Sequence, residues 1–136
     1  MAEFFPIVIH HNPGCGTSRN VVAMVEAAGY APTIVEYLQT GWTRPQLQAL
    51  LAAMGAHPRD VLREKGGPAA ELGLLRPEAS DAEILDAMID HPILVNRPIV
   101  ATPKGVKLCR PSEVVLDLLE RKPASFTKED GEIVRL

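Results

Sequence analysis

Cys15 is the residue of this sequence best suited to covalent chemistry. It follows an apolar run at residues 7–9 and precedes apolar residues at helical spacing, so it is predicted at the junction between a strand and a helix. The N-terminus of a helix offers unpaired backbone N–H groups and a partial positive charge, which favour a thiolate over a thiol and also bind oxyanions. The pattern therefore predicts a nucleophilic cysteine beside an anion site.

The neighbours of this cysteine are candidate supporting residues. Gly16 leaves room for a ligand to approach the backbone, and Thr17 and Ser18 add hydroxyl donors, so we expect an accessible sulfur. His11 either tunes the thiolate and orients the loop or is a satisfied polar residue at the end of the strand, and both interpretations stay open. Because successive strand residues point to opposite faces, His10 is expected to face elsewhere.

Arg97 and Arg110 are each followed directly by a proline, Pro98 and Pro111, which favours extended backbone at the arginine. Each lies at the end of a predicted strand. Guanidinium groups bind tetrahedral oxyanions through paired N–H donors and lower the pKa of a nearby thiol. We therefore expect both arginines over the cysteine. Arg63 is expected to reach the same pocket from a short helix, although an arginine in such a place is often solvated surface.

Strand and helix patterns alternate along the chain around these residues. The chain predicts a strand at 7–9, a helix at about 16–28, a strand at 32–37, helices beginning after Thr43, Pro58 and Ser80, strands at 99–102 and 106–109, a long helix after Pro111, and a short helical segment from Thr127 to about Glu132. The order β-α-β, helical insertion at about 43–91, β-hairpin, α is typical of a thioredoxin-like α/β domain with a mixed sheet. We expect one domain over residues 1–136.

Composition restricts the classes of partner. The net charge of −3 gives no reason to expect nucleic acid or an anionic membrane surface as partner. No signal peptide or apolar run of about 20 residues occurs, so a cytoplasmic protein is expected. Two cysteines and four histidines without zinc-site spacing predict free thiols and no metal site. Without a long apolar stripe to form an interface, we expect a monomer.

Three separated stretches carry a resemblance to a known family. They are His11-Asn12-Pro13-Gly14-Cys15-Gly16-Thr17-Ser18-Arg19-Asn20, His91-Pro92-Ile93-Leu94-Val95-Asn96-Arg97-Pro98-Ile99-Val100 and Leu108-Cys109-Arg110-Pro111-Ser112-Glu113-Val114-Val115. Through them the chain resembles the glutaredoxin-coupled bacterial arsenate reductases over about residues 7–131. The resemblance implies a thioredoxin-like fold and a role in arsenic detoxification.

The resemblance also assigns roles to residues. It implies that Cys15 is the nucleophile, that Arg63, Arg97 and Arg110 bind the oxyanion, and that the peptide bond before Pro98 is cis. The thiolate would attack arsenate to give a covalent thiol–arsenic adduct, to which glutathione adds; a glutaredoxin thiol then takes over the glutathione and arsenite is released. Arsenate, glutathione and glutaredoxin are thus the implied partners, with no metal and no bound cofactor.

One position departs from the pattern of the family. Residue 10 is tyrosine in familiar members and histidine in this sequence, which leaves the contacts at the entry to the Cys15 loop open. Cys109 lies on a predicted buried strand, where we expect an inert thiol, although its role is open.

Alternative functions lack key residues. A phosphatase-like reductase needs an arginine six residues after its cysteine, where this chain has Val21, and a dithiol oxidoreductase needs a second cysteine at Ser18. A thioredoxin-like redox-sensing regulator that binds RNA polymerase is the remaining alternative. Regulators of that kind typically carry the second cysteine and lack the full arginine set, so an enzyme is favoured.

Overall fold

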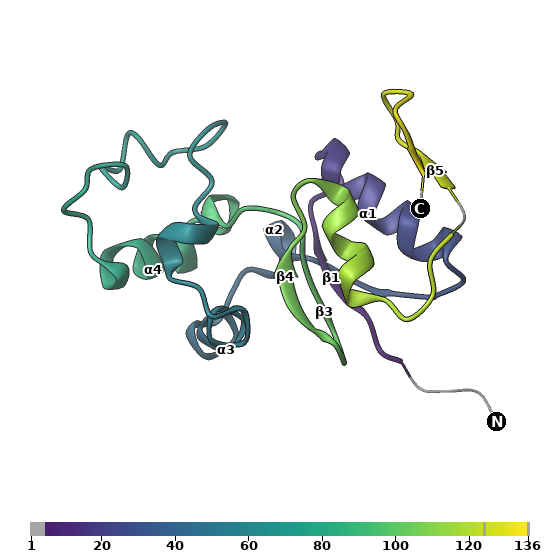
Figure 1. Ribbon diagram of the computed structural model, residues 1–136. Coiled ribbons are helices and arrows are strands. Elements are labelled where there is room, and N and C mark those ends of the chain that lie inside the picture. The colour runs from purple at the N-terminus through teal and green to yellow at the C-terminus, as the bar shows by residue number, and fades with distance from the viewer. Residues whose placement is uncertain (1–4, 124, 136) are drawn as a thin grey trace. The chain divides into compact units, whose positions relative to one another are not determined.

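The computed structural model describes residues 5–123 and 125–135, which fall into two compact units. One unit is built from residues 1–36 and 97–136, and the other from residues 37–96. The helical insertion expected at about 43–91 lies within the second unit. Figure 1 colours the elements of both units along the chain.

The first unit contains a mixed four-stranded sheet. The strands β1 (Val8–His11), β2 (Thr33–Glu36), β3 (Ile99–Thr102) and β4 (Gly105–Leu108) lie in the order β2-β1-β3-β4. β1 pairs in parallel with β2 and antiparallel with β3, and β3 and β4 form the predicted hairpin. The expected β-α-β unit and hairpin are therefore confirmed. The C-terminal end of β1 lies beside the start of β3.

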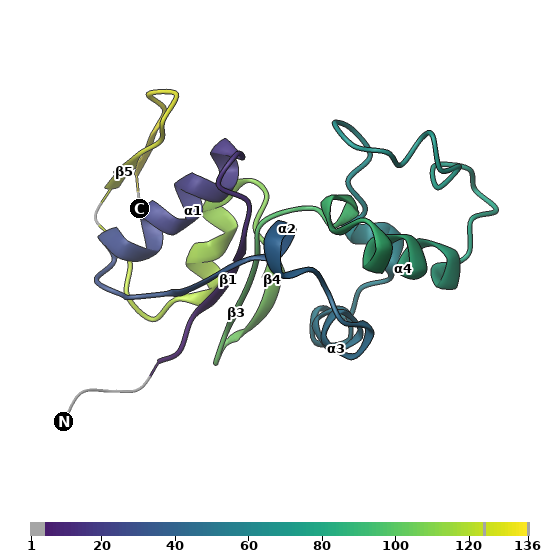
Figure 2. The same ribbon diagram turned by 180° about the vertical axis from the view of Figure 1, so that it is seen from behind.

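Two helices cover one face of this sheet, α1 (Gly16–Ala27) and the 3-10 helix η3 (Ser112–Leu118), as Figures 1 and 2 show. α1 presents Val21, Met24 and Val25 to a core that also includes Ile9 of β1 and Val100 of β3. Burial of such apolar side chains supplies most of the favourable free energy of folding. The core therefore fixes the start of α1 against the end of β1, where Cys15 lies.

The predicted long helix after Pro111 is wrong in length and type, because η3 is a 3-10 helix of seven residues. Its last carbonyls are already bonded by the β3–β4 hairpin. Thr102 Oγ1 donates to Leu118 O over 2.8 Å, and Lys104 Nζ donates to Leu119 O over 3.2 Å. Because side chains satisfy these groups, the helix does not need a further turn to do so.

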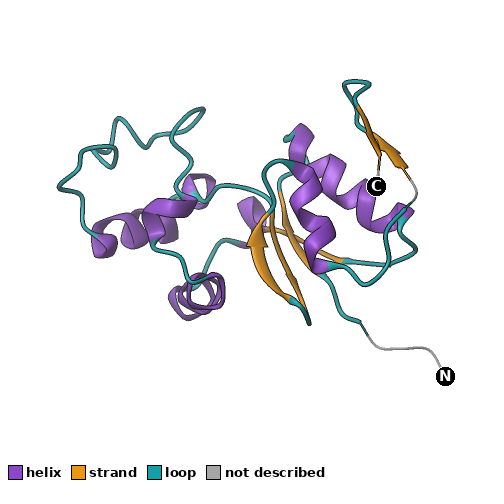
Figure 3. Ribbon diagram, viewed as in Figure 1, coloured by secondary structure: helices purple, strands orange, loops and turns teal. Residues whose placement is uncertain are grey.

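The short helix predicted from Thr127 to about Glu132 is also wrong. This part of the chain forms an antiparallel hairpin of β5 (Ser125–Thr127) and β6 (Ile133–Arg135), drawn as orange arrows in Figure 3. Phe126 and Val134 pack against the core of the first unit, while their strand neighbours are exposed. This alternation has the period of a strand, so tertiary burial overrides the weak helical signal.

The second unit is helical. It contains α2 (Tyr37–Thr40), α3 (Arg44–Met54), η1 (Pro58–Val61), α4 (Asp81–Asp90) and η2 (Pro92–Leu94). The predicted capping boxes are confirmed, since Thr43 caps α3 with Gln46 and Ser80 caps α4 with Glu83. Figure 3 shows that loops join these helices.

Arg63 does not lie on a helix, contrary to the prediction. η1 ends at Val61, and the next residue, Leu62, forms an antiparallel bridge with Val95. The backbone N–H of Arg63 donates to Leu94 O over 2.8 Å. Backbone pairing with the segment after α4 begins where η1 ends, so Arg63 lies outside the helix.

Within the described residues, 5–123 and 125–135, no helix combines the length and apolar character needed to cross a membrane.

Candidate functional site

Cys15 is the N-cap residue of α1, as its position in the sequence predicts. Its backbone is extended, with φ −108° and ψ 123°, and its carbonyl accepts the N–H of Arg19 over 3.0 Å. Its own N–H donates to Asn12 O over 3.0 Å. The side chain therefore lies at the positive end of a 12-residue helix. It is less accessible than expected, since only 6% of the residue is exposed.

Arg110 contacts the sulfur directly. Its Nη1 lies 3.8 Å from Cys15 Sγ and also donates to Arg97 O over 3.0 Å. The sheet explains this arrangement. β3 pairs with β1 on one side and with β4 on the other, so Arg97, just before β3, and Arg110, just after β4, lie at the end of the sheet where β1 ends. Arg110 is exposed and Arg97 half-buried, so an anion from solvent can reach this end of the sheet.

Both arginines precede a cis peptide bond. The bond before Pro98 is cis, as the resemblance implies, and the bond between Arg110 and Pro111 is also cis, which was not predicted. Pro98 is buried, and its carbonyl accepts the N–H of Cys109 over 2.9 Å. The segment that carries Arg97 is therefore tied to the segment that carries Arg110.

The surroundings of Cys15 lower the pKa of its thiol. Burial alone raises that pKa, because it disfavours the charged form, but the backbone N–H of Ser18 and the positive charges of Arg97 and Arg110 outweigh burial. The site thus favours the thiolate, which is the nucleophilic form of cysteine.

This direction makes a prediction about reactivity at different pH values. In a Cys109→Ala variant, the rate of alkylation of Cys15 by iodoacetamide should rise with pH around a midpoint below about 8.5, the value of a free thiol. Since the folded protein holds the pKa down, the reactive thiolate persists to lower pH. A midpoint at or above 8.5 would contradict an activated thiol.

His11 is bonded to the first turn of α1 and not to the sulfur. Its Nδ1 lies 2.6 Å from Ser18 Oγ, which also accepts the backbone N–H of Asn12 over 3.1 Å. Burial lowers the pKa of His11 against the opposing effect of the Glu36 carboxylate, and burial lowers the pKa of His10 to about 4. His11 is therefore a satisfied buried group that also fixes Ser18, whose N–H faces the thiol.

Asn12 has a structural role that was not predicted from the sequence. Its Oδ1 accepts the N–H of Gly14 over 2.8 Å, so its side chain closes the turn before Cys15. Asparagine followed by proline and glycine is a common turn signal, and this pattern was visible in the sequence. The turn presents the carbonyl of Asn12 to the Cys15 N–H.

The other predicted residues differ in their surroundings. Gly16 begins α1, and a Cβ there would meet its nearest neighbours at an ordinary 3.8 Å, so space alone does not demand glycine. Thr17 is half-buried in the first turn. Arg63 belongs to the second unit, where its Nε donates to Lys65 O over 2.9 Å, and its role at the site stays a prediction.

Cys109 has the properties of an inert thiol. It is fully buried, directly after β4, and burial raises its pKa to about 12. Both cysteines are free. Among the side chains that the structure describes, no three His, Cys, Asp or Glu groups are placed to share a metal ion.

The sequence of this chain matches known proteins over most of its length. A sequence model described as the ArsC family matches residues 10–118. The chain belongs to the ArsC family. It is 63% identical over 129 residues to the arsenate reductase ArsI2 of Synechocystis sp., covering 94% of this chain and 92% of that protein, and 53% identical to an arsenate reductase of Escherichia coli over the same shares.

Solved structures agree with this assignment. An arsenate reductase from Vibrio cholerae superposes with a TM-score of 0.81 at 36% identity, covering 86% of this chain and all of that one. The predicted thioredoxin-like α/β class is therefore confirmed. In this ArsC-family chain, the nucleophile candidate, its helix N-terminus and two arginines lie together at one end of the sheet.

Proposed function

We propose that the protein is an arsenate reductase in which Cys15 is the nucleophile and Arg63, Arg97 and Arg110 bind the oxyanion. The observation that carries the proposal is the contact of Arg110 Nη1 with Cys15 Sγ at 3.8 Å, at the N-terminus of α1. Two guanidinium charges and the helix N-terminus favour both a thiolate and a bound oxyanion. Arsenate reductase relatives at 53% and 63% identity support arsenate as the substrate.

The first chemical step is attack of the Cys15 thiolate on arsenic(V). A sulfur–arsenic bond forms and one arsenic–oxygen bond breaks, with the oxygen leaving as hydroxide or, after protonation, as water. Arg97 and Arg110 stabilise the negative charge on the remaining oxygens of the adduct. Arsenic keeps its oxidation state in this step, so reduction requires further thiols.

Glutathione and glutaredoxin supply the two electrons in this scheme. Glutathione replaces a second oxygen on arsenic, which leaves as water, and a glutaredoxin thiolate then attacks the glutathione sulfur. A disulfide forms between glutathione and glutaredoxin, and the electron pair of the bond between arsenic and the glutathione sulfur stays on arsenic, which becomes trivalent. Hydroxide then replaces the Cys15 sulfur on arsenic, so arsenite is released and the Cys15 thiolate is regenerated. An external thiol is favoured because Cys109 is fully buried with a raised pKa and Ser18 replaces a second motif cysteine.

The test is the formation of arsenite from arsenate by the purified protein with glutathione and glutaredoxin. We expect arsenite only when protein, glutathione and glutaredoxin are all present, and one glutathione–glutaredoxin disulfide for each arsenite formed. Turnover with thioredoxin in place of glutathione and glutaredoxin would contradict the proposed reductant. Binding to the α-subunit of RNA polymerase without arsenate turnover would instead favour a regulator.

A further inference from the structure

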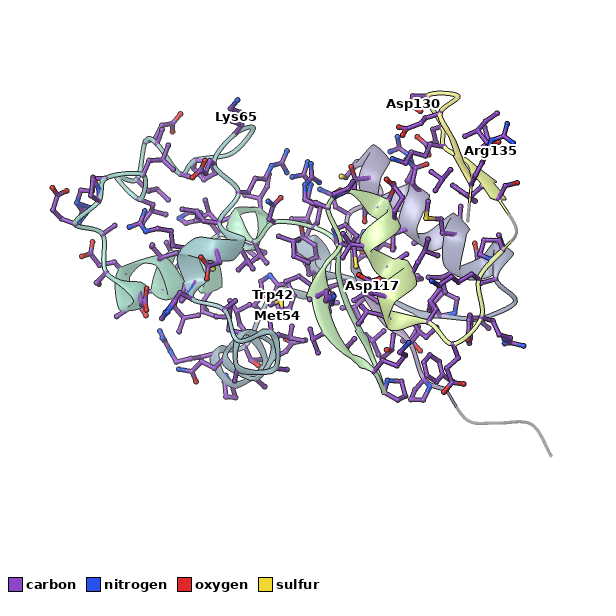
Figure 4. All side chains as sticks on the ribbon, in the orientation of Figure 1. Trp42, Met54, Lys65, Asp117, Asp130 and Arg135 are labelled. Carbon is purple, nitrogen blue, oxygen red and sulfur yellow. The ribbon has the colours of Figure 1, made fainter. Side chains whose placement is uncertain are left out.

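The C-terminal hairpin lies against both segments that carry the candidate site. Figures 1 and 2 show β5 beside α1, and Figure 4 labels Asp130 in its loop. On the side of η3, which follows Arg110, Lys128 Nζ forms an ion pair with Glu113 at 2.5 Å. Lys128 is nearly buried there, with 10% of its side chain exposed. The hairpin is therefore anchored beside the segment that contains Arg110.

On the side of α1, one guanidinium joins the hairpin to the Cys15 loop. Arg19 donates through Nε to Glu129 Oε2 over 2.8 Å and through Nη2 to Glu129 Oε1 over 2.9 Å. Its remaining Nη1 donates to Pro13 O over 2.7 Å. Pro13 lies two residues before Cys15, so Glu129 orients the group that holds this loop.

The Arg19–Glu129 pair differs from an ordinary surface ion pair. Most exposed pairs contribute little, because two flexible side chains must be fixed for a contact that water screens. Here the contact is bidentate, which restricts the orientation of both groups. Glu129 is also fixed through its backbone, since its N–H donates to Asn20 Oδ1 over 3.1 Å. The guanidinium is thus held in one orientation toward Pro13 O.

We propose that Arg19 and Glu129 are positioning residues, through which the C-terminal hairpin holds the Pro13–Cys15 turn in the geometry that places the sulfur beside Arg110 and the Ser18 N–H. Neither residue needs to touch substrate for this role. For its effect on turnover the inference rests on the proposed arsenate reduction, whereas its effect on the loop is independent of any substrate.

Positioning and simple charge effects predict opposite changes at the sulfur. If Glu129 acted only through its charge, its removal would leave Arg19 unneutralised and would lower the pKa of Cys15. If Glu129 holds the loop, its removal loosens the contacts of Sγ with the Ser18 N–H and Arg110, which are among the causes that lower that pKa. The pKa of Cys15 should then rise toward that of a free thiol.

The decisive experiment compares Glu129→Gln with Glu132→Gln, each in a Cys109→Ala background. Glu132 is a matched control on the same hairpin, where its carboxylate pairs with Lys128 at 3.3 Å. The midpoint of Cys15 alkylation by iodoacetamide against pH should rise in Glu129→Gln and stay at the parent value in Glu132→Gln. A lowered or unchanged midpoint in Glu129→Gln, or equal shifts in both variants, overturns the proposal.

Amide hydrogen exchange gives a second readout without substrate. The N–H groups of Gly14 and Cys15, both bonded to Asn12, should exchange about fivefold faster in Glu129→Gln, while amides of β3 keep their rates. Arg19→Lys keeps the charge but loses the planar set of N–H donors, so the same two amides should exchange as fast as they do in Glu129→Gln. In the double variant they should exchange no faster than in either single variant. Unchanged loop exchange or additive effects contradict the proposal.

Turnover completes the test. Glu129→Gln should lower kcat for arsenate about tenfold and change KM less than about twofold, as expected when geometry and not binding is lost. If the wild-type protein does not reduce arsenate, the proposed function fails, but alkylation and exchange still decide whether Arg19 and Glu129 hold the loop.

Discussion

Cys15→Ser is expected to abolish arsenate reduction, whereas Cys109→Ala should retain most of it. Cys15 lies at the N-terminus of α1, its sulfur contacts Arg110 at 3.8 Å, and the pKa of its thiol is lowered. A serine hydroxyl in its place is not ionised at neutral pH. Cys109 is fully buried, with a pKa raised to about 12, so it stays a thiol. Arsenite production in the presence of glutathione and glutaredoxin measures both variants.

Folding must be controlled in this comparison. Cys109 packs in the core with Val115 and Leu116, so Cys109→Ala removes buried volume and should lower the free energy of unfolding by about 1–3 kcal/mol. Activity is therefore compared below the unfolding transition of each variant. If folded Cys109→Ala is as inactive as Cys15→Ser, an internal disulfide takes part in the cycle and the scheme with one protein thiol is wrong.

Replacing Arg97 or Arg110 with lysine should reduce kcat/KM by a factor equivalent to about 2–4 kcal/mol of transition-state stabilisation. Lysine keeps the positive charge but loses the planar fork. Arg110 uses one nitrogen to bond Arg97 O and to contact Cys15 Sγ, and a lysine ammonium cannot reproduce that geometry. Because the arginine is fixed before substrate arrives, most of the loss should appear in kcat. Steady-state kinetics of both variants measure it.

Arg63→Lys serves as the comparison for these two variants. Arg63 lies outside η1, and its backbone N–H is bonded to Leu94 O. Its Nε donates to Lys65 O over 2.9 Å, within the second unit. We expect the smallest loss of the three, mainly in KM. Wild-type activity in Arg97→Lys would place that arginine outside the site.

Much of the fold was predictable because the signals are local. The capping boxes at Thr43 and Ser80, and the left-handed glycines at Gly29 and Gly55, begin or end helices through hydrogen bonds among residues a few positions apart. The placement of Cys15 at the start of α1 follows from the same kind of signal. Such contacts depend on sequence separation and not on the rest of the molecule.

Because these signals are local, they do not predict elements that depend on contacts between residues far apart in the sequence. The segment predicted as a helix from Thr127 is a hairpin because Phe126 and Val134 bury against a core that other parts of the chain supply. The helix after Pro111 is short because Thr102 and Lys104 bond its last carbonyls. Distant contacts outweigh local propensities that differ by less than about 1 kcal/mol per residue.

Local sequence signals were enough to predict the residue types of the site, to place Cys15 at the start of a helix, and to place Arg97 and Arg110 at strand ends. The distances between these residues follow from the tertiary fold. The pairing of β3 with β1 and β4 brings Arg110 from 95 positions away to the sulfur, and the C-terminal hairpin brings Glu129 to Arg19 across 110 positions. No pattern of local spacing encodes such contacts, because they exist only when the sheet and its core have formed.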